Sequence, residues 1–146
     1  MPHPVMFRDD DPVLGRVREI ALAFPQAYEK VSHGRPAFFV TKMFVMYGGS
    51  VRPPAKGDYL QYPQSIVVKV DASDRAALAK DPRFFFPAYL GPSGWLGLDL
   101  GARRTGDRDV DRDVDWDVDW DEVGELVDAS FRLTAPKKLI SQLDQV

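Results

Sequence analysis

Six basic residues lie on or beside the segments that the sequence predicts as β-strands: Lys30, Arg35, Lys42, Arg52, Lys56 and Lys69. Lysine and arginine side chains gathered on one surface are the groups that contact nucleic-acid phosphates. If the strands present these six cations on a common face, they form a phosphate-binding patch. If the strands do not, the cations are scattered, solvated charges, and the sequence alone leaves both interpretations open.

Aromatic residues supply the second candidate chemistry. Nine of them could stack on bases or line a ligand pocket: Phe38, Phe39, Phe44, Phe84, Phe85, Phe86, Tyr89, Trp95 and Trp120. We expect most of them in the core, since aromatic side chains bury the largest areas. Three consecutive phenylalanines cannot all point inward from one strand or helix, so at least one is exposed or lines a pocket. A pocket for a small aromatic ligand, lined by Phe86, Tyr89 and Trp95, is therefore an alternative function.

A run of acidic residues gives the third candidate. Residues 107–122 hold nine acids and two bases, whereas the remaining chain has 17 bases against 13 acids and the whole chain a net charge of −3. Four similar tetrapeptides fill 108–123, and we interpret 103–118 as an inserted surface loop, because loop tips tolerate insertion. Carboxylates at every second residue could instead hold Ca²⁺ weakly, although the repeat lacks the glycine and the bidentate glutamate of a dedicated calcium loop. Mimicry of DNA by this tract is a further alternative.

Catalytic signatures are missing from the sequence. There are no cysteines and two histidines, and no nucleophile elbow, phosphate loop or dinucleotide fingerprint is found. The turn at 91–94 is expected to be structural, and so is His33. We therefore expect a protein that is not an enzyme, with no cofactor and no metal site beyond the weak one considered above. No apolar run is long enough to span a bilayer and 1–11 does not read as a secretory signal, which favours the cytoplasm without membrane partners.

The helices and strands that position these residues are predicted from hydrophobic periodicity and from the glycines and prolines that interrupt it. A loose arm is predicted over 1–10, then a helix that starts at an Asp11 cap and runs to Phe24. Strands are predicted at 27–33, 37–40, 43–47, 65–70 and 95–100, with a long loop or wing over 50–64 and a short helix over 75–80. A last helix starts at Asp119 in an Asp-x-x-Glu capping box and ends at Pro136, and 141–146 is a tail. This order predicts one α+β domain with a largely antiparallel sheet.

Several short segments also occur in a familiar order. They include His-Gly-Arg-Pro-Ala-Phe-Phe-Val at 33–40, Ile-Val-Val-Lys-Val at 66–70, Gly94-Trp95, Asp-Trp-Asp-Glu-Val at 119–123 and Ala-Pro-Lys-Lys-Leu at 135–139. The chain resembles the MmcQ/YjbR family over about 27–139. The resemblance implies a frataxin/CyaY-like fold, with an antiparallel sheet packed against the N- and C-terminal helices, in a bacterial cytoplasmic protein. It also implies DNA binding, a label that the family carries by analogy with a double-wing architecture.

Overall fold

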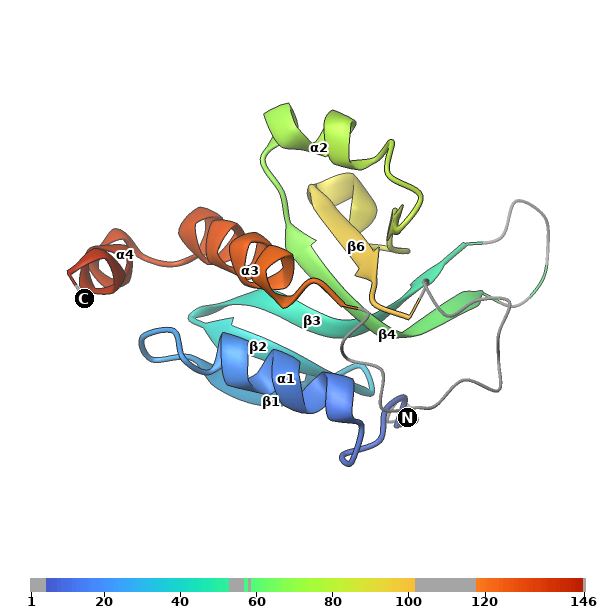
Figure 1. Ribbon diagram of the computed structural model, residues 1–146, viewed down its shortest axis with the longest axis horizontal. Coiled ribbons are helices and arrows are strands. Elements are labelled where there is room, and N and C mark those ends of the chain that lie inside the picture. The colour runs from blue at the N-terminus through green and yellow to red at the C-terminus, as the bar shows by residue number, and fades with distance from the viewer. Residues whose placement is uncertain (1–4, 53–56, 58, 102–117, 146) are drawn as a thin grey trace.

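The computed structural model describes residues 5–52, 57, 59–101 and 118–145. The elements of this part of the chain follow one another as shown in Figure 1. They are α1 (Pro12–Ala21), β1 (Tyr28–Ser32), β2 (Arg35–Val40), β3 (Lys42–Val51), β4 (Leu60–Lys69), α2 (Ala72–Leu78), β5 (Phe84–Phe85), the 3₁₀ helix η1 (Gly91–Ser93), β6 (Trp95–Asp99), α3 (Trp120–Thr134) and α4 (Lys137–Asp144).

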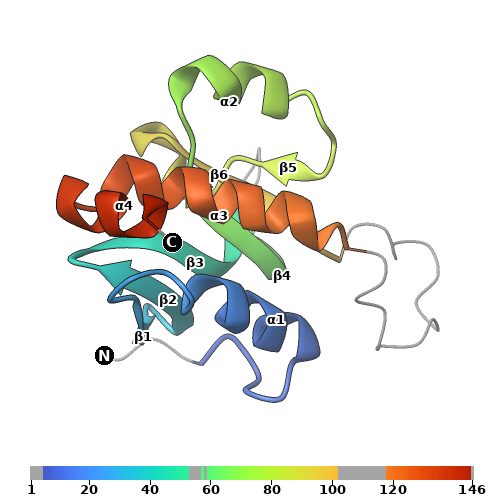
Figure 2. The same ribbon diagram turned by 60° about the vertical axis from the view of Figure 1, so that its left-hand side comes forward.

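The six strands form one sheet in the order β1-β2-β3-β4-β6-β5. Each pair of neighbouring strands is antiparallel. Helices α1, α3 and α4 lie on the same side of this sheet in both views (Figures 1 and 2). Helix α3 contacts β3 and β4, and α1 contacts β3 and α3. The predicted α+β class, with an antiparallel sheet packed against N- and C-terminal helices, is therefore confirmed.

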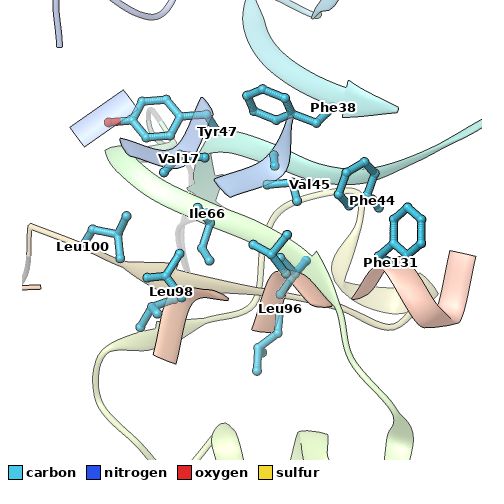
Figure 3. Packing of buried hydrophobic residues seen from close by; sticks show 14 of the residues in the cluster. Val17, Phe38, Phe44, Val45, Tyr47, Ile66, Leu96, Leu98, Leu100 and Phe131 are labelled. Carbon is cyan, nitrogen blue, oxygen red and sulfur yellow. The ribbon is translucent and has the colours of Figure 1, made fainter. Parts of the chain in front are cut away.

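The main core fills the space between the sheet and these helices (Figure 3). Phe38, Phe44 and Tyr47 project from β2 and β3 into this cluster, and Phe131 projects from α3. The rings of Phe44 and Phe131 meet edge-on, with centroids 5.3 Å apart. This is one of the geometries that aromatic quadrupoles favour. The contact fixes α3 against β3.

Both predicted helix caps are present. Asp11 accepts a hydrogen bond from the backbone N–H of Val13, and Asp119 accepts one from that of Glu122. The expected capping box is incomplete, because the Glu122 carboxylate is hydrogen-bonded to Arg83 at 2.8 Å and 3.0 Å. Helix α1 also ends earlier than expected, at Ala21, and Phe24 packs on the Phe131 ring from the turn that follows.

The predicted loop or wing over 50–64 is wrong at both ends. Strand β3 continues to Val51 and β4 begins at Leu60. The sequence misled because Gly48, Gly49 and Pro63 are residues that normally interrupt strands. Here they occupy an irregularity, since the register shifts between Tyr47 and Gly49. A bulge accommodates a proline that has no N–H to donate and a glycine at positive φ.

The termini also differ from the expectation. The predicted tail over 141–146 is largely helical, because α4 extends to Asp144 with Leu139 buried on the core. Helix α2 begins at Ala72 rather than at residue 75, since Asp71 caps it by accepting a hydrogen bond from the Ser73 N–H. In the predicted arm, residues 5–10 form no helix or strand, but the Met6 N–H donates to the Gly34 carbonyl at 2.8 Å.

Candidate functional site

The face of the sheet that points away from α1 and α3 carries a second, smaller apolar cluster. We call it the second face. Its buried members are Ala37, Met46, Val67, Phe85 and Trp95, and partly buried hydrophobic residues, Phe39 and Tyr62 among them, pack against these. Because alternate residues of a strand point to opposite faces, this cluster identifies which side chains share the second face.

The three consecutive phenylalanines divide between the two faces and the solvent. Phe84 joins the main core and Phe85 the second cluster, whereas Phe86 is 57% exposed. The Phe85 ring stacks on Tyr62, with centroids 4.2 Å apart, and lies against Gly97 and Gly49. This confirms that the three could not all be buried together.

Two of the predicted phosphate-contacting lysines lie on the second face. Lys30 of β1 is directly opposite Ala37, and its Nζ lies 4.9 Å from the centroid of the Phe39 ring. Lys69 of β4 is directly opposite Trp95. Residues directly opposite one another in an antiparallel pair point to the same face. Lys30 and Lys69 therefore point to the same face of the sheet, and Lys69 lies at the end of that face beside α2.

Arg35 belongs with them by alternation along β2, but it is buried, with 8% of its surface exposed. Its Nη2 donates to the Gln61 Oε1 at 2.5 Å. Burial lowers the pKa of the Arg35 guanidinium, because a low dielectric disfavours the charged form. Arg35 therefore adds positive potential to the second face but exposes little of its own surface.

The remaining predicted cations are placed elsewhere. Lys42 is opposite Val40, a residue of the main core, so it lies on the side of the helices at the start of β3. Arg52 follows β3 and is exposed. The hydrogen bond with Tyr89 and the nearby Arg52 guanidinium lower the pKa of Tyr59. Lys56 lies outside the described residues.

Ion pairing separates these cations from the other arginines. Arg18 is paired with Asp9 and Glu29, Arg83 with Asp81 and Glu122, and Arg132 with Asp128 and Asp144. Within the described part of the chain, none of the five placed candidates forms an ion pair: Lys30, Arg35, Lys42, Arg52 and Lys69. Their charges are therefore not cancelled by a neighbouring carboxylate there.

Arg75 is a further cation at this site that sequence reasoning missed. A Cβ built on Gly94 would lie 3.0 Å from the Arg75 Nη1 and 3.7 Å from the Lys69 Cε. Two side chains from β4 and α2 thus converge over one backbone position, which a side chain would obstruct. The local sequence does not predict that Arg75 lies near Gly94, because the pairing of β4 with β6 brings the two together.

The predicted aromatic pocket is not assembled as an enclosed site. Trp95 is buried in the second cluster, whereas Phe86 is 57% and Tyr89 76% exposed. A groove of about 460 Å³ lies elsewhere, between α2 and α3, and contains none of the three. Its lining includes Lys69, Asp71, Asp74, Leu78, Leu126 and Leu133. A smaller hollow at Arg83 and Glu122, about 10 Å³, has room for one water at most.

The predictions about metal ions and membranes can be compared only with the described residues. Residues 102–117, which hold most of the acidic repeat, lie outside the described residues, so weak cation binding there stays a prediction. Among the residues that are placed, no group of three or more histidine, aspartate or glutamate side chains is arranged to hold a metal ion. No helix in the same residues is long and apolar enough to cross a membrane.

Comparisons with known proteins place the chain in a family. No curated protein matches it. No solved structure matches it either. Residues 22–133, well over half of the chain, match the model of the YjbR family. The match contains all six strands, α2 and nearly all of α3. It agrees with the resemblance seen in the short sequence segments, and the chain therefore belongs to the YjbR family.

Proposed function

We propose that this protein binds DNA through the second face of its sheet and catalyses no reaction. One observation carries the proposal: Lys30, Arg35 and Lys69 point to the face of the sheet opposite α1 and α3, and no carboxylate of the described residues pairs with them. Arg75 extends this group beside Lys69. Positive charge without a counter-ion is what attracts a polyanion, and binding releases the cations condensed on the nucleic acid.

The spacing of these charges suits an extended ligand rather than a single anion. Three strand intervals separate β1 from β4, which places Lys30 and Lys69 about 14 Å apart across the sheet. That distance is several times the ~3.4 Å axial spacing of phosphates along one strand of DNA. The two amines would therefore contact different phosphates of the same polyanion.

The net charge of the chain limits the strength of this binding. A protein of net charge −3 is repelled by DNA at long range. Three phosphate contacts, by Lys30, Lys69 and Arg75, correspond to a slope of log K against log salt of about −3. We therefore expect binding in the micromolar range or weaker at physiological salt, typical of contacts with the phosphate backbone.

The test is a fluorescence-anisotropy titration of labelled DNA at several salt concentrations. The double variant Lys30→Ala/Lys69→Ala should weaken binding and make the salt slope shallower by about two, one unit for each lost phosphate contact. Its matched control is Lys137→Ala/Lys138→Ala, which removes the same charge from exposed positions of α4 on the side of the helices. Equal weakening by both double variants would show a general charge effect and would contradict the proposed face.

The other functional expectations keep the status of predictions. The frataxin/CyaY-like assignment of the fold rests on the resemblance, and the cytoplasmic location stays an expectation from the sequence. Small-molecule binding would have to use the groove between α2 and α3 rather than Phe86, Tyr89 and Trp95, since those three residues do not enclose a ligand.

A further inference from the structure

We infer that the nucleic acid bound on the second face is single-stranded DNA, whose bases stack on exposed tyrosines at two points beside unpaired cations. This inference rests on the proposed function and specifies its ligand.

The first stacking point lies at the β1 edge of the sheet. Tyr28 is 48% exposed, and its ring stacks on that of Phe39, with centroids 5.6 Å apart and planes inclined by 17°. Lys30 lies two residues further along β1, with its Nζ over the same Phe39 ring. The Phe39 ring thus holds an exposed tyrosine and an exposed amine next to each other. A base on Tyr28 would bring its phosphate within reach of Lys30.

The second stacking point lies beyond the other end of β3. The rings of Tyr59 and Tyr89 are nearly parallel, with an interplanar angle of 11°, centroids 6.1 Å apart and hydroxyl oxygens 3.4 Å apart. Tyr89 is 76% exposed and adopts a φ of +70°, a left-handed conformation that is unfavourable for a bulky residue. The Arg52 guanidinium lies near enough to Tyr59 to lower the pKa of its phenol. The same combination of an exposed tyrosine and a cation therefore recurs.

The cations between these two points follow the course of β3. Phe39 is paired with Met43 near the start of β3, and Lys30 is paired with Ala37, which is itself opposite Met46. Arg35 lies against Gly48, and Arg52 follows Val51. From Met43 to Val51 the strand covers about 26 Å. An extended polynucleotide along β3 would meet a tyrosine, Lys30, Arg52 and a second tyrosine in this order, and it would pass over the positive potential of the buried Arg35.

Stacking distinguishes single strands from a duplex. In a duplex the faces of the bases are covered by their neighbours, so exposed tyrosine rings gain nothing from it. In a single strand each base can stack on an aromatic side chain while the phosphates meet basic groups. Salt-dependent binding by the lysines would occur with either ligand, so the tyrosines decide between the two.

The experiment compares labelled oligothymidine of about 16 nucleotides with a duplex of the same length, by anisotropy at one low salt concentration. Tyr28→Leu and Tyr89→Leu should each weaken single-strand binding by about tenfold, whereas Tyr28→Phe and Tyr89→Phe should leave it nearly unchanged, because stacking needs the ring and not the hydroxyl. Leu133→Ala, which trims a 45% exposed side chain on α3, is the control and should have no effect. Two independent tyrosines are tested, so that loss of folding in one variant, checked by circular dichroism, leaves the other.

The outcomes separate the inference from the proposed function. Tighter binding of the single strand, lost in the leucine variants and kept in the phenylalanine variants, supports both. Equal or tighter binding of the duplex, weakened by Lys30→Ala/Lys69→Ala but not by either tyrosine substitution, overturns the inference and leaves DNA binding in place. No binding of either ligand by the wild-type protein overturns both.

Discussion

The guanidinium of Arg35 lies directly against Gly48, so closely that a Cβ built on the glycine would come within 2.5 Å of Nη1. Gly48 has a φ of +88°, which an L side chain rarely adopts. The pair therefore explains why β3 contains a glycine at this point. The bulge gives the buried arginine space, and the hydrogen bond to Gln61 holds it there.

Gly48→Ala should destabilise the protein by about 1–3 kcal/mol, because it imposes the left-handed backbone on alanine and displaces Arg35. Chemical denaturation measures the change. Gly124→Ala in α3 is the matched control, since nothing lies within 4 Å of its built Cβ. An alanine in a helix interior should raise the free energy of unfolding by about 0.5–1 kcal/mol. If both variants had the same stability, the close approach of Arg35 to Gly48 would be ruled out.

Ser130 connects α3 to two strands through a buried hydroxyl. Its Oγ donates to the Phe44 carbonyl at 2.6 Å and accepts from the Lys69 N–H at 3.0 Å. Ser130→Ala should cost about 2–4 kcal/mol, since it removes the hydrogen bonds to the buried Phe44 carbonyl and to the half-buried Lys69 N–H. The thermal or denaturant midpoint reports this loss. Ser141→Ala, at an exposed position of α4, should change stability by less than about 0.5 kcal/mol. A comparably small effect at Ser130 would contradict the described hydrogen bonds.

The contact between Tyr59 and Tyr89 can be tested by titration. Hydrogen bonding with Tyr89, followed by the nearby Arg52 guanidinium, lowers the pKa of the Tyr59 phenol, because both stabilise the phenolate. Tyr89→Phe removes the larger contribution, so the pKa of Tyr59 should rise towards its ordinary range. NMR of ring-labelled tyrosine follows this directly. Tyr62, which stacks on Phe85, serves as the internal reference. A Tyr59 titration that is unchanged in Tyr89→Phe would contradict the hydrogen bond between the two hydroxyls.

Local patterns in the sequence predicted much of the fold. Asp11 and Asp119 predict the starts of helices because aspartate can cap a helix, and the β-branched run around Val67 predicts a strand. The same rules failed at 50–64, because Gly48 and Pro63 mark a bulge as readily as a loop. They also failed at 141–146, where the burial of Leu139 against the core stabilises a helix that is too short to persist alone.

The candidate site was predictable in type but not in arrangement. The sequence identifies Lys30, Arg35 and Lys69 as cations near strands, but register decides which face each one takes. Arg35 is buried and Lys42 points to the other side, and neither fact has a local signal. Arg75 was missed because its neighbour, Gly94, is brought close by the pairing of β4 with β6. Charge placement therefore required the sheet order, which the sequence did not specify.

The most direct measurement of the central claim is to map the DNA-binding surface by amide chemical shifts. A ¹⁵N-labelled sample is titrated with single-stranded DNA at low salt. We expect the largest shifts at Lys30, Phe39 and Lys69 and at Arg52 and Tyr89, while the outer surfaces of α1, α3 and α4 are unaffected. Shifts concentrated on those helices, or no shifts at DNA concentrations well above the micromolar range, would contradict it.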